Sequence, residues 1–219
     1  PDLSEDALKR GFSNEGTIQG AFRPLNNIIG MWIIQECRRD WQKQGIDLSW
    51  DAIVEAAKAA TPLVSVINPD APDFVAPGNI PKRIQEYCAR TGQPVPETVG
   101  QIIRTIFDSL ALRYRWAVEA IDDMKGKKTP FINIVGGGTK EGPLCQFCAD
   151  ACNRPVYAGP VEATAIGNIT VQAIAAGAIK DMSEARHVIR NSFEIKHYEP
   201  RAESTAIFDE AYERFKKLI

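Results

Sequence analysis

The sequence has few histidines, no long apolar run and no excess of positive charge. Only two histidines occur among its 219 residues, His187 and His197, and their spacing is not that of a metal-ligand pair. No run of about 18 apolar residues is present, so we expect no membrane-spanning helix. Lys and Arg number 26 against 28 Asp and Glu. This balance argues against nucleic acid as the main partner, because phosphate neutralisation needs a clustered excess of cations.

The five cysteines lack the even, regular spacing of a secreted disulfide scaffold, which favours a reducing cytoplasm. Cys145 and Cys148 form a Cys-x-x-Cys pair, but a second ligand pair is missing. With Cys152 they follow the i, i+3, i+7 spacing of one helix face. We therefore predict that the three cysteines are small apolar residues on a buried helix face, and we predict no metal site.

The chain also lacks an initiator methionine and an apolar signal core at its start, since it opens on the acidic stretch Pro1-Asp2-Leu3-Ser4-Glu5-Asp6. We expect this start to be a processed end or a cut within a longer chain.

Hydrophobic periodicity and turn residues predict α/β organisation with a parallel crossover. Residues 1–24 read as irregular or extended. Helices are expected from Pro24 through Cys37, from Ser49 to Ala60, at 82–90, from Glu97 to about Met124, at 143–152, from 160 to 176, and near 183–191 and 203–218. Five prolines mark residues 61–81 as a long ordered loop. Strands are expected at 131–135 and 155–158.

The triple glycine Gly136-Gly137-Gly138 follows the first of these strands and precedes a helix. Glycines leave no Cβ atoms over the strand end and tolerate positive φ, so a phosphate-bearing ligand can approach the backbone closely. A glycine turn that binds nothing remains the alternative. Neither a Walker A loop nor a dinucleotide GxGxxG pattern is present.

The surrounding residues resemble the C-terminal lobe of the FGGY carbohydrate kinases. The resemblance rests on Ile134 to Gly138, on Leu144 to Ala151, and on Arg154 to Asn168. Asn14-Glu15-Gly16, Asn27 to Glu36 and Ile106 to Ala111 resemble one branch of that family, which phosphorylates L-rhamnulose. These motifs keep the family's order and extend over essentially the whole chain.

The resemblance implies an α/β fold, namely the C-terminal lobe of an actin-like ATPase (ribonuclease H-like) sugar kinase without its first strands, over residues 1–219. It implies that Asn27 contacts the sugar and that Gln35, Gly136, Gly137, Gly138 and Glu141 lie at the nucleotide. Without it, Asn27 and Gln35 read as ordinary capping or solvated positions. We expect Asn27 and Gln35 to share a helix face at i and i+8. The sequence departs from the family at Thr139-Lys140-Glu141, where a Ser-Gln-Asn-like stretch is usual, and at Pro143, where Leu is common.

The resemblance further implies ATP and Mg²⁺ as cofactors and a small sugar as the other partner, without nucleic acid or membrane. The family's catalytic base, an Asp in a His-Asp-Thr-like motif, has no counterpart here, so we expect no catalytic residue in this chain. A kinase of another ketose, such as fuculose or xylulose, and a non-catalytic nucleotide-binding module remain alternatives.

The missing first strands also predict a property of the N-terminal region. The stretch from Phe12 to Phe22 should have an unpaired edge and exposed apolar surface. We therefore expect self-association of the truncated chain, or disorder, around residues 1–25.

Overall fold

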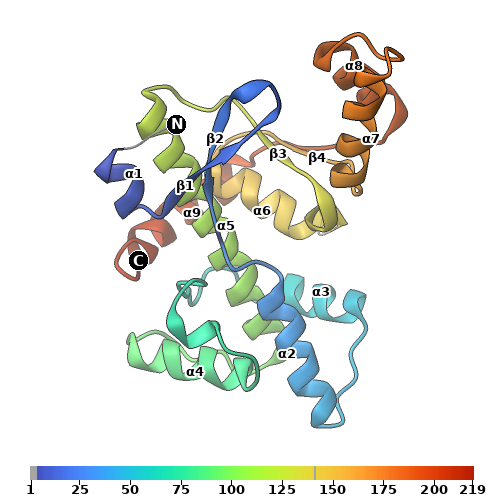
Figure 1. Cartoon of the computed structure of the whole chain (residues 1–219). Coiled ribbons are helices and arrows are strands. Elements are labelled where there is room, and N and C mark those ends of the chain that lie inside the picture. Colours follow the sequence, from blue (N-terminus) through green and yellow to red (C-terminus); the bar gives the residue numbers. More distant parts are fainter. Residues whose placement is uncertain (1–3, 141) are drawn as a thin grey trace. The chain divides into compact units, whose positions relative to one another are not determined.

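The computed structural model describes residues 4–140 and 142–219, which separate into two compact units. Unit 1 comprises residues up to Thr129 together with Ala206–Ile219, and unit 2 comprises Pro130–Thr205. Figure 1 labels the helices and strands along the chain. None of the helices within the described ranges is long and apolar enough to cross a membrane. The two units are described in turn.

Unit 1 begins with a short helix and a hairpin, where the sequence predicted only irregular or extended chain. Helix α1 (Glu5–Lys9) is capped by the Ser4 hydroxyl, which accepts a hydrogen bond from the Ala7 N–H. Strands β1 (Phe12–Gly16) and β2 (Phe22–Asn26) pair antiparallel, with the 3₁₀ helix η1 (Ile18–Gly20) between them. Phe12 and Ala7 are buried with Ala120, against Trp116, Ile121 and Met124.

The stretch predicted as one extended segment with an unpaired edge, Phe12 to Phe22, spans β1, η1 and the first residue of β2, and the described residues of 1–25 have regular structure rather than the alternative of disorder. Residues 1–3 lie outside the described residues. The expected exposure of apolar surface is present, since Ile18 and Phe22 are 46% and 54% exposed. Each strand pairs only with the other among residues 4–140 and 142–219, so each leaves one unpaired edge. Self-association stays a prediction.

Helix α2 (Trp32–Lys43) begins eight residues later than predicted. Pro24 lies in β2, opposite Asn14, rather than in the first turn of a helix. Proline lacks an N–H, and a two-stranded hairpin tolerates it because each strand has an edge that needs no partner. Residues 27–31 form a connection between β2 and α2 without helix or strand.

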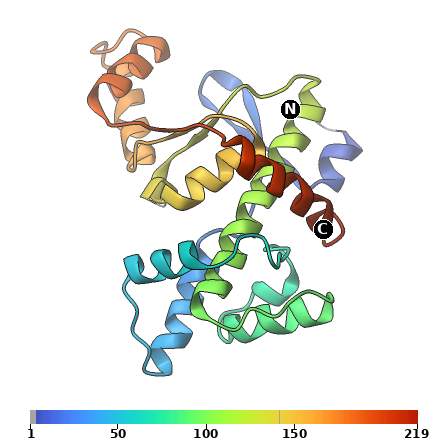
Figure 2. The same cartoon turned by 180° about the vertical axis from the view of Figure 1, so that it is seen from behind.

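The remaining helices of unit 1 match the predicted pattern. They are α3 (Trp50–Ala59), capped by Ser49, α4 (Ile80–Arg90) and α5 (Val99–Lys125), whose capping box pairs Thr98 with Gln101. The proline-rich loop contains one 3₁₀ turn, η2 (Pro72–Phe74). Helix α9 (Ala202–Phe215) returns beside α5, where the Tyr212 hydroxyl donates to Glu119 (Figure 2).

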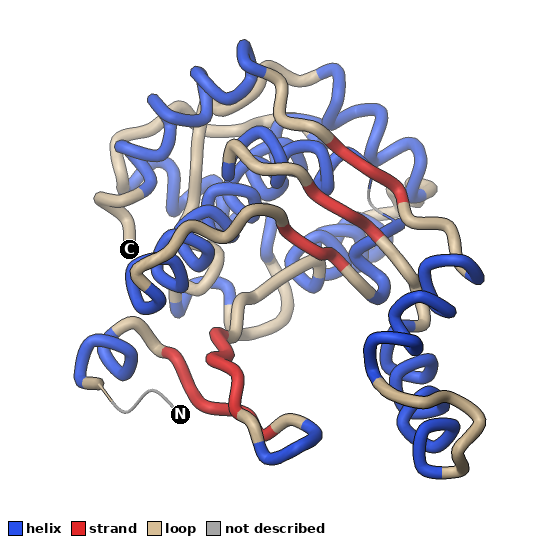
Figure 3. Tube along the Cα trace, turned by 90° about the horizontal axis from the view of Figure 1, so that it is seen from above, coloured by secondary structure: helices blue, strands red, loops and turns tan. Residues whose placement is uncertain are grey.

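Unit 2 is built on a three-stranded sheet in the order β3-β4-β5, shown side by side in Figure 3. Strands β3 (Ile132–Ile134) and β4 (Val156–Ala158) are parallel, as predicted, and helix α6 (Gly142–Cys152) connects them. Strand β5 (Lys196–Tyr198) pairs antiparallel with β4 and was not predicted. Three residues with two charged or polar side chains give too short a pattern for a strand to be recognised.

Helices α7 (Ala163–Ala175) and α8 (Met182–Ser192) lie between β4 and β5 in the chain. The Asp181 side chain caps α8 by accepting from the N–H groups of Ser183 and Glu184. Thr170 is the one buried residue among those of α7, although the helix is mostly apolar.

The contact between α3 and α5 depends on Gly100. A Cβ atom at this position would come within 2.4 Å of the Ala56 carbonyl oxygen, which is backbone and cannot turn away. Gly100 therefore allows the two helices to approach more closely than any other residue would.

We expect Gly100→Ala to lower the free energy of unfolding by about 2 kcal/mol or more, because the helices must separate. Gly167→Ala, in α7, is the matched control, since its Cβ would meet nothing within 4 Å. That control should be neutral or slightly stabilising through helix propensity. Urea unfolding of both variants measures the effect, and an equal stability change in the two would contradict the assignment.

Asp108 is a fully buried carboxylate on α5. It accepts hydrogen bonds from Arg104 Nε at 2.8 Å and from the Leu63 N–H at 2.6 Å. Burial outweighs both contacts and raises the pKa of Asp108 from 3.8 to about 6. The folded chain therefore retains this proton at a higher pH than the unfolded chain does.

As the pH rises from about 4 to about 6, Asp108 should lower the free energy of unfolding, because the unfolded state releases its proton at a lower pH than the folded state does. Asp108→Asn should remove this part of the pH dependence, on the order of 2 to 3 kcal/mol across the window. Denaturant unfolding at a series of pH values measures it, with the exposed Glu97→Gln as the control. Parallel stability curves for the parent chain and Asp108→Asn would rule out the raised pKa.

Candidate nucleotide and sugar site

The three predicted glycines form most of a 3₁₀ turn, η3 (Gly136–Lys140), directly after β3. The Gly136 N–H donates to the Pro160 carbonyl at 3.1 Å, and the Gly159 N–H donates to the Ile134 carbonyl at 2.9 Å. The turn is thus tied to the chain that leaves the neighbouring parallel strand. The carboxyl ends of parallel strands are where α/β sheets bind ligands.

Side chains from within the turn and from α6 hold the glycine carbonyls. The Thr139 hydroxyl donates to the Gly136 carbonyl at 2.7 Å, and the Cys145 thiol donates to the Gly138 carbonyl at 3.6 Å. Thr139 and Cys145 are buried residues, and both hydrogen bonds are partly buried. The glycine turn is therefore a fixed structure rather than a flexible linker.

The three glycines differ in what the fold requires of them. Gly136 has φ +77°, a conformation that favours glycine. Gly137 has an ordinary φ, and a Cβ atom there would meet nothing within 4 Å. The fold of this chain thus explains glycine at 136 but not at 137, where a side chain would point into open space.

Two hollows border this part of unit 2. One, of about 340 Å³, is lined by the end of the glycine turn at Thr139 and Lys140 and by residues after β4 and around β5, including Lys196. A larger one, of about 630 Å³, lies against Asn133, Tyr157 and His197, and its lining includes none of the predicted nucleotide residues. Neither Lys140 nor Lys196 was among the predicted site residues. Lys196 lies in β5, a strand that the sequence did not predict.

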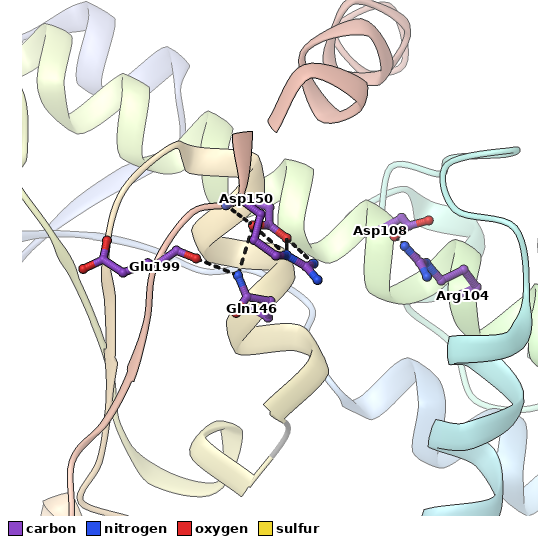
Figure 4. A network of polar contacts seen from close by, with 6 residues as sticks. Arg104, Asp108, Gln146, Asp150 and Glu199 are labelled. Carbon is purple, nitrogen blue, oxygen red and sulfur yellow. Dashed lines mark hydrogen bonds and ion pairs between the residues drawn. The ribbon is translucent and has the colours of Figure 1, made fainter. Parts of the chain in front are cut away.

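The helix behind the turn is anchored by a buried carboxylate. Asp150 on α6 is fully buried and accepts from the Arg201 backbone N–H at 2.8 Å and from Arg201 Nη2 at 2.5 Å. Gln146 Nε2 donates both to Asp150 and to the Glu199 carbonyl (Figure 4). These contacts attach the chain that follows β5 to α6.

The three clustered cysteines lie on the buried face of α6, as predicted. A hydrogen bond to Cys152, together with burial, raises the pKa of the Cys148 thiol. Such a thiol is a weak nucleophile and a poor metal ligand. No group of three or more His, Cys, Asp or Glu side chains is placed to hold a metal ion within residues 4–140 and 142–219.

Asn27 and Gln35 lie in unit 1 and do not share a helix, contrary to the prediction. Asn27 is in the connection between β2 and α2, and Gln35 is in the first turn of α2, so the i and i+8 argument does not hold. The helix starts late because Pro24 belongs to β2. Both side chains are exposed and free to meet a ligand.

The predicted residues therefore fall into two groups. Asn27 and Gln35 belong to unit 1, and Gly136, Gly137 and Gly138 belong to unit 2. Glu141, the remaining predicted nucleotide residue, lies outside the described residues. Gly30 resembles Gly137, because its φ is ordinary and a Cβ there would meet nothing within 4 Å.

Comparisons with known proteins agree with the sequence motifs. Residues 1–176 match the model of the C-terminal domain of the FGGY family of carbohydrate kinases. The chain is 40% identical over 219 residues to a rhamnulokinase of Bacteroides thetaiotaomicron, and all of it aligns with 44% of that protein. It is 41% identical to a rhamnulokinase of Pectobacterium carotovorum, of which it covers 43%. The chain thus spans less than half the length of these curated relatives.

Solved structures show the same fold at lower identity. A ligand-bound xylulose kinase from Lactobacillus acidophilus superposes with a TM-score of 0.68 at 14% identity, over all of this chain and 43% of that one. A gluconate kinase from the same species gives a TM-score of 0.65 at 15% identity, over 95% of this chain and 41% of that one. The α/β fold predicted from the sequence, that of the C-terminal part of an actin-like sugar kinase, is confirmed, and the chain belongs to the FGGY family of carbohydrate kinases.

Proposed function

We propose that the protein containing this chain is an ATP-dependent rhamnulokinase, which transfers the γ-phosphoryl group of ATP to the 1-hydroxyl of L-rhamnulose. Identity near 40% to curated rhamnulokinases supports this sugar over the alternatives. The xylulose and gluconate kinase structures are only 14% and 15% identical. Fuculose and xylulose remain the sugars against which the choice is tested.

In this proposal the glycine turn receives the nucleotide, and Gly137 is the observation that supports it best. The turn is held on both sides, and the fold itself places nothing where a Cβ of residue 137 would lie. A glycine at such a position, after a strand end, leaves room for a ligand to approach the backbone closely. Lys140 and Lys196 line the hollow beside the turn together with Glu162 and Glu194, so the proposal rests on the backbone of the turn and not on a net positive charge.

The chain's own residues contribute positioning. Gly137 and Gln35 are the proposed nucleotide contacts and Asn27 is the proposed sugar contact, and all three are positioning roles. Mg²⁺ would supply charge neutralisation at the nucleotide phosphates, and it would need few ligands from this chain. The base that accepts the hydroxyl proton is not supplied by this chain, so the 219 residues alone should give no turnover.

Gly137→Ala in the full-length enzyme should raise the KM for ATP about tenfold, equivalent to about 1.4 kcal/mol of nucleotide binding. The reason is that a methyl group would occupy the space through which the nucleotide reaches the backbone. The KM for the sugar should change less than twofold. A coupled assay of ADP release with L-rhamnulose measures both constants.

Gly16→Ala is the matched control, because Gly16 also has an ordinary φ and its Cβ also meets nothing within 4 Å, but it lies in β1 of unit 1. It should leave both constants unchanged. Higher kcat/KM with L-fuculose or D-xylulose than with L-rhamnulose would replace the proposed sugar. An unchanged KM for ATP in Gly137→Ala, or rapid turnover by the 219 residues alone, would overturn the assigned roles.

A further inference from the structure

The connection from β2 to α2 carries the proposed sugar residue, and it is held by side chains rather than by secondary structure. Asn27 is the first residue of the five-residue connection 27–31, which has no strand or helix of its own. Loops that present functional residues need such external anchors, since an unanchored loop loses binding energy to conformational entropy. Residues on both sides of Asn27 form a hydrogen bond with a side chain, and the two side chains that hold them form an ion pair with each other.

The ion pair joins Asp70 of the proline-rich loop to Arg113 of α5. Arg113 Nε donates to Asp70 Oδ2 at 2.6 Å. The other carboxylate oxygen, Asp70 Oδ1, accepts from the Ile29 N–H at 2.7 Å. Asp70 therefore fixes the backbone two residues after Asn27.

Arg113 fixes the residue before Asn27. Its Nη2 donates to Asn26 Oδ1 at 2.6 Å, and the Asn26 Nδ2 donates to the Arg10 and Gly11 carbonyls, each at 3.0 Å. Both polar atoms of the Asn26 side chain are engaged, so its orientation is determined. The chain at Asn27 is thus held from both sides by one buried guanidinium and its partner carboxylate.

Arg113 suits this role better than a stabilising one. It is 7% exposed, and its guanidinium stacks over the Trp116 ring at 4.3 Å. Its Nη1 is buried without a hydrogen-bond acceptor among the residues that the structure describes, which carries a cost in stability. Asp70 is partly exposed, and an ion pair of this kind contributes little net stability, whereas it can specify one geometry. Lysine could not reproduce the two directed bonds of the guanidinium fork.

We propose that Asp70 and Arg113 are positioning residues that set the sugar affinity of the enzyme by holding Asn27 in its binding orientation. This inference rests on the proposed contact between Asn27 and the sugar. Neither residue touches the sugar itself, so removing the pair lowers affinity through Asn27 and leaves the nucleotide contacts intact.

The test is a double-mutant cycle in the full-length enzyme with L-rhamnulose and ATP. Arg113→Met keeps the aliphatic stem and removes the directed bonds, and it should raise the KM for the sugar about tenfold while the KM for ATP changes less than twofold. Arg113→Lys should fall between Arg113→Met and the parent. Asn27→Ala should raise the sugar KM as well. In the Asn27→Ala background, Arg113→Met should add little further change, because the residue that it positions is absent.

Arg90→Met is the matched control. Arg90 forms an ion pair with Asp73 at 2.8 Å in the same proline-rich loop, whereas the hydrogen bonds to Asn26 and Ile29 come from Arg113 and Asp70. It should leave both KM values unchanged. If Arg113→Met does not fold, Asp70→Asn, which weakens the pairing while it keeps an acceptor for Ile29, carries the same expectation.

The outcomes separate the two proposals. An unchanged sugar KM in Asn27→Ala overturns the sugar contact of Asn27. A raised sugar KM in Asn27→Ala with an unchanged one in Arg113→Met overturns the positioning role. Equal increases in the KM for sugar and for ATP, or full additivity with Asn27→Ala, also overturn it, because a general structural defect would produce that pattern.

Discussion

The backbone of residues 63–71 is largely buried without helix or strand, and its hydrogen bonds are a constraint on which the rest of unit 1 depends. A buried N–H group without an acceptor costs on the order of 1 to 3 kcal/mol, so each needs a partner. Side chains supply them: the N–H groups of Leu63, Val66, Ile67 and Asn68 donate to Asp108, Gln93, Ser109 and the Tyr87 hydroxyl. Helix α5 contributes two of these acceptors. It then contributes Arg113, which pairs with Asp70 at the end of the same segment.

This arrangement explains why α5 is polar on a face that is nevertheless buried. Arg104, Asp108, Ser109 and Arg113 are all at most 9% exposed. Burying such groups is unfavourable unless they are paired, and here their partners are the proline-rich loop and one another. Prolines in that loop reduce the number of backbone N–H groups that require acceptors. The loop therefore behaves as part of the core, although it has no regular secondary structure.

The sequence predicted the elements whose signal is local. The stripe of apolar residues located α5 within two residues at its start and one at its end, and Ser49 and Pro62 bracketed α3. The hairpin was missed because β1 and β2 show no clean alternation. The prediction of a helix start at Pro24 was wrong, because the fixed φ of proline suits both the first turn of a helix and an edge strand. Strand β5 depends on its pairing with β4 and on the attachment of the following residues to Asp150, which no local pattern reveals.

The candidate site likewise has one part that could be located from the sequence and one part that could not. The glycine turn could be located from sequence, since a strand, three glycines and a helix form a continuous pattern. The surroundings of Asn27 could not, because Ile29 and Asp70 are 41 residues apart and Arg113 and Asn26 are 87 apart. In both units a carboxylate joins a segment without regular structure to a helix: the partly exposed Asp70 pairs with Arg113 of α5, and the buried Asp150 of α6 pairs with Arg201. A carboxylate has two oxygens and about four acceptor positions, so it can bind an arginine and a backbone N–H at once. That capacity is what allows a single residue to fix both the direction of a side chain and the path of the backbone beside a ligand.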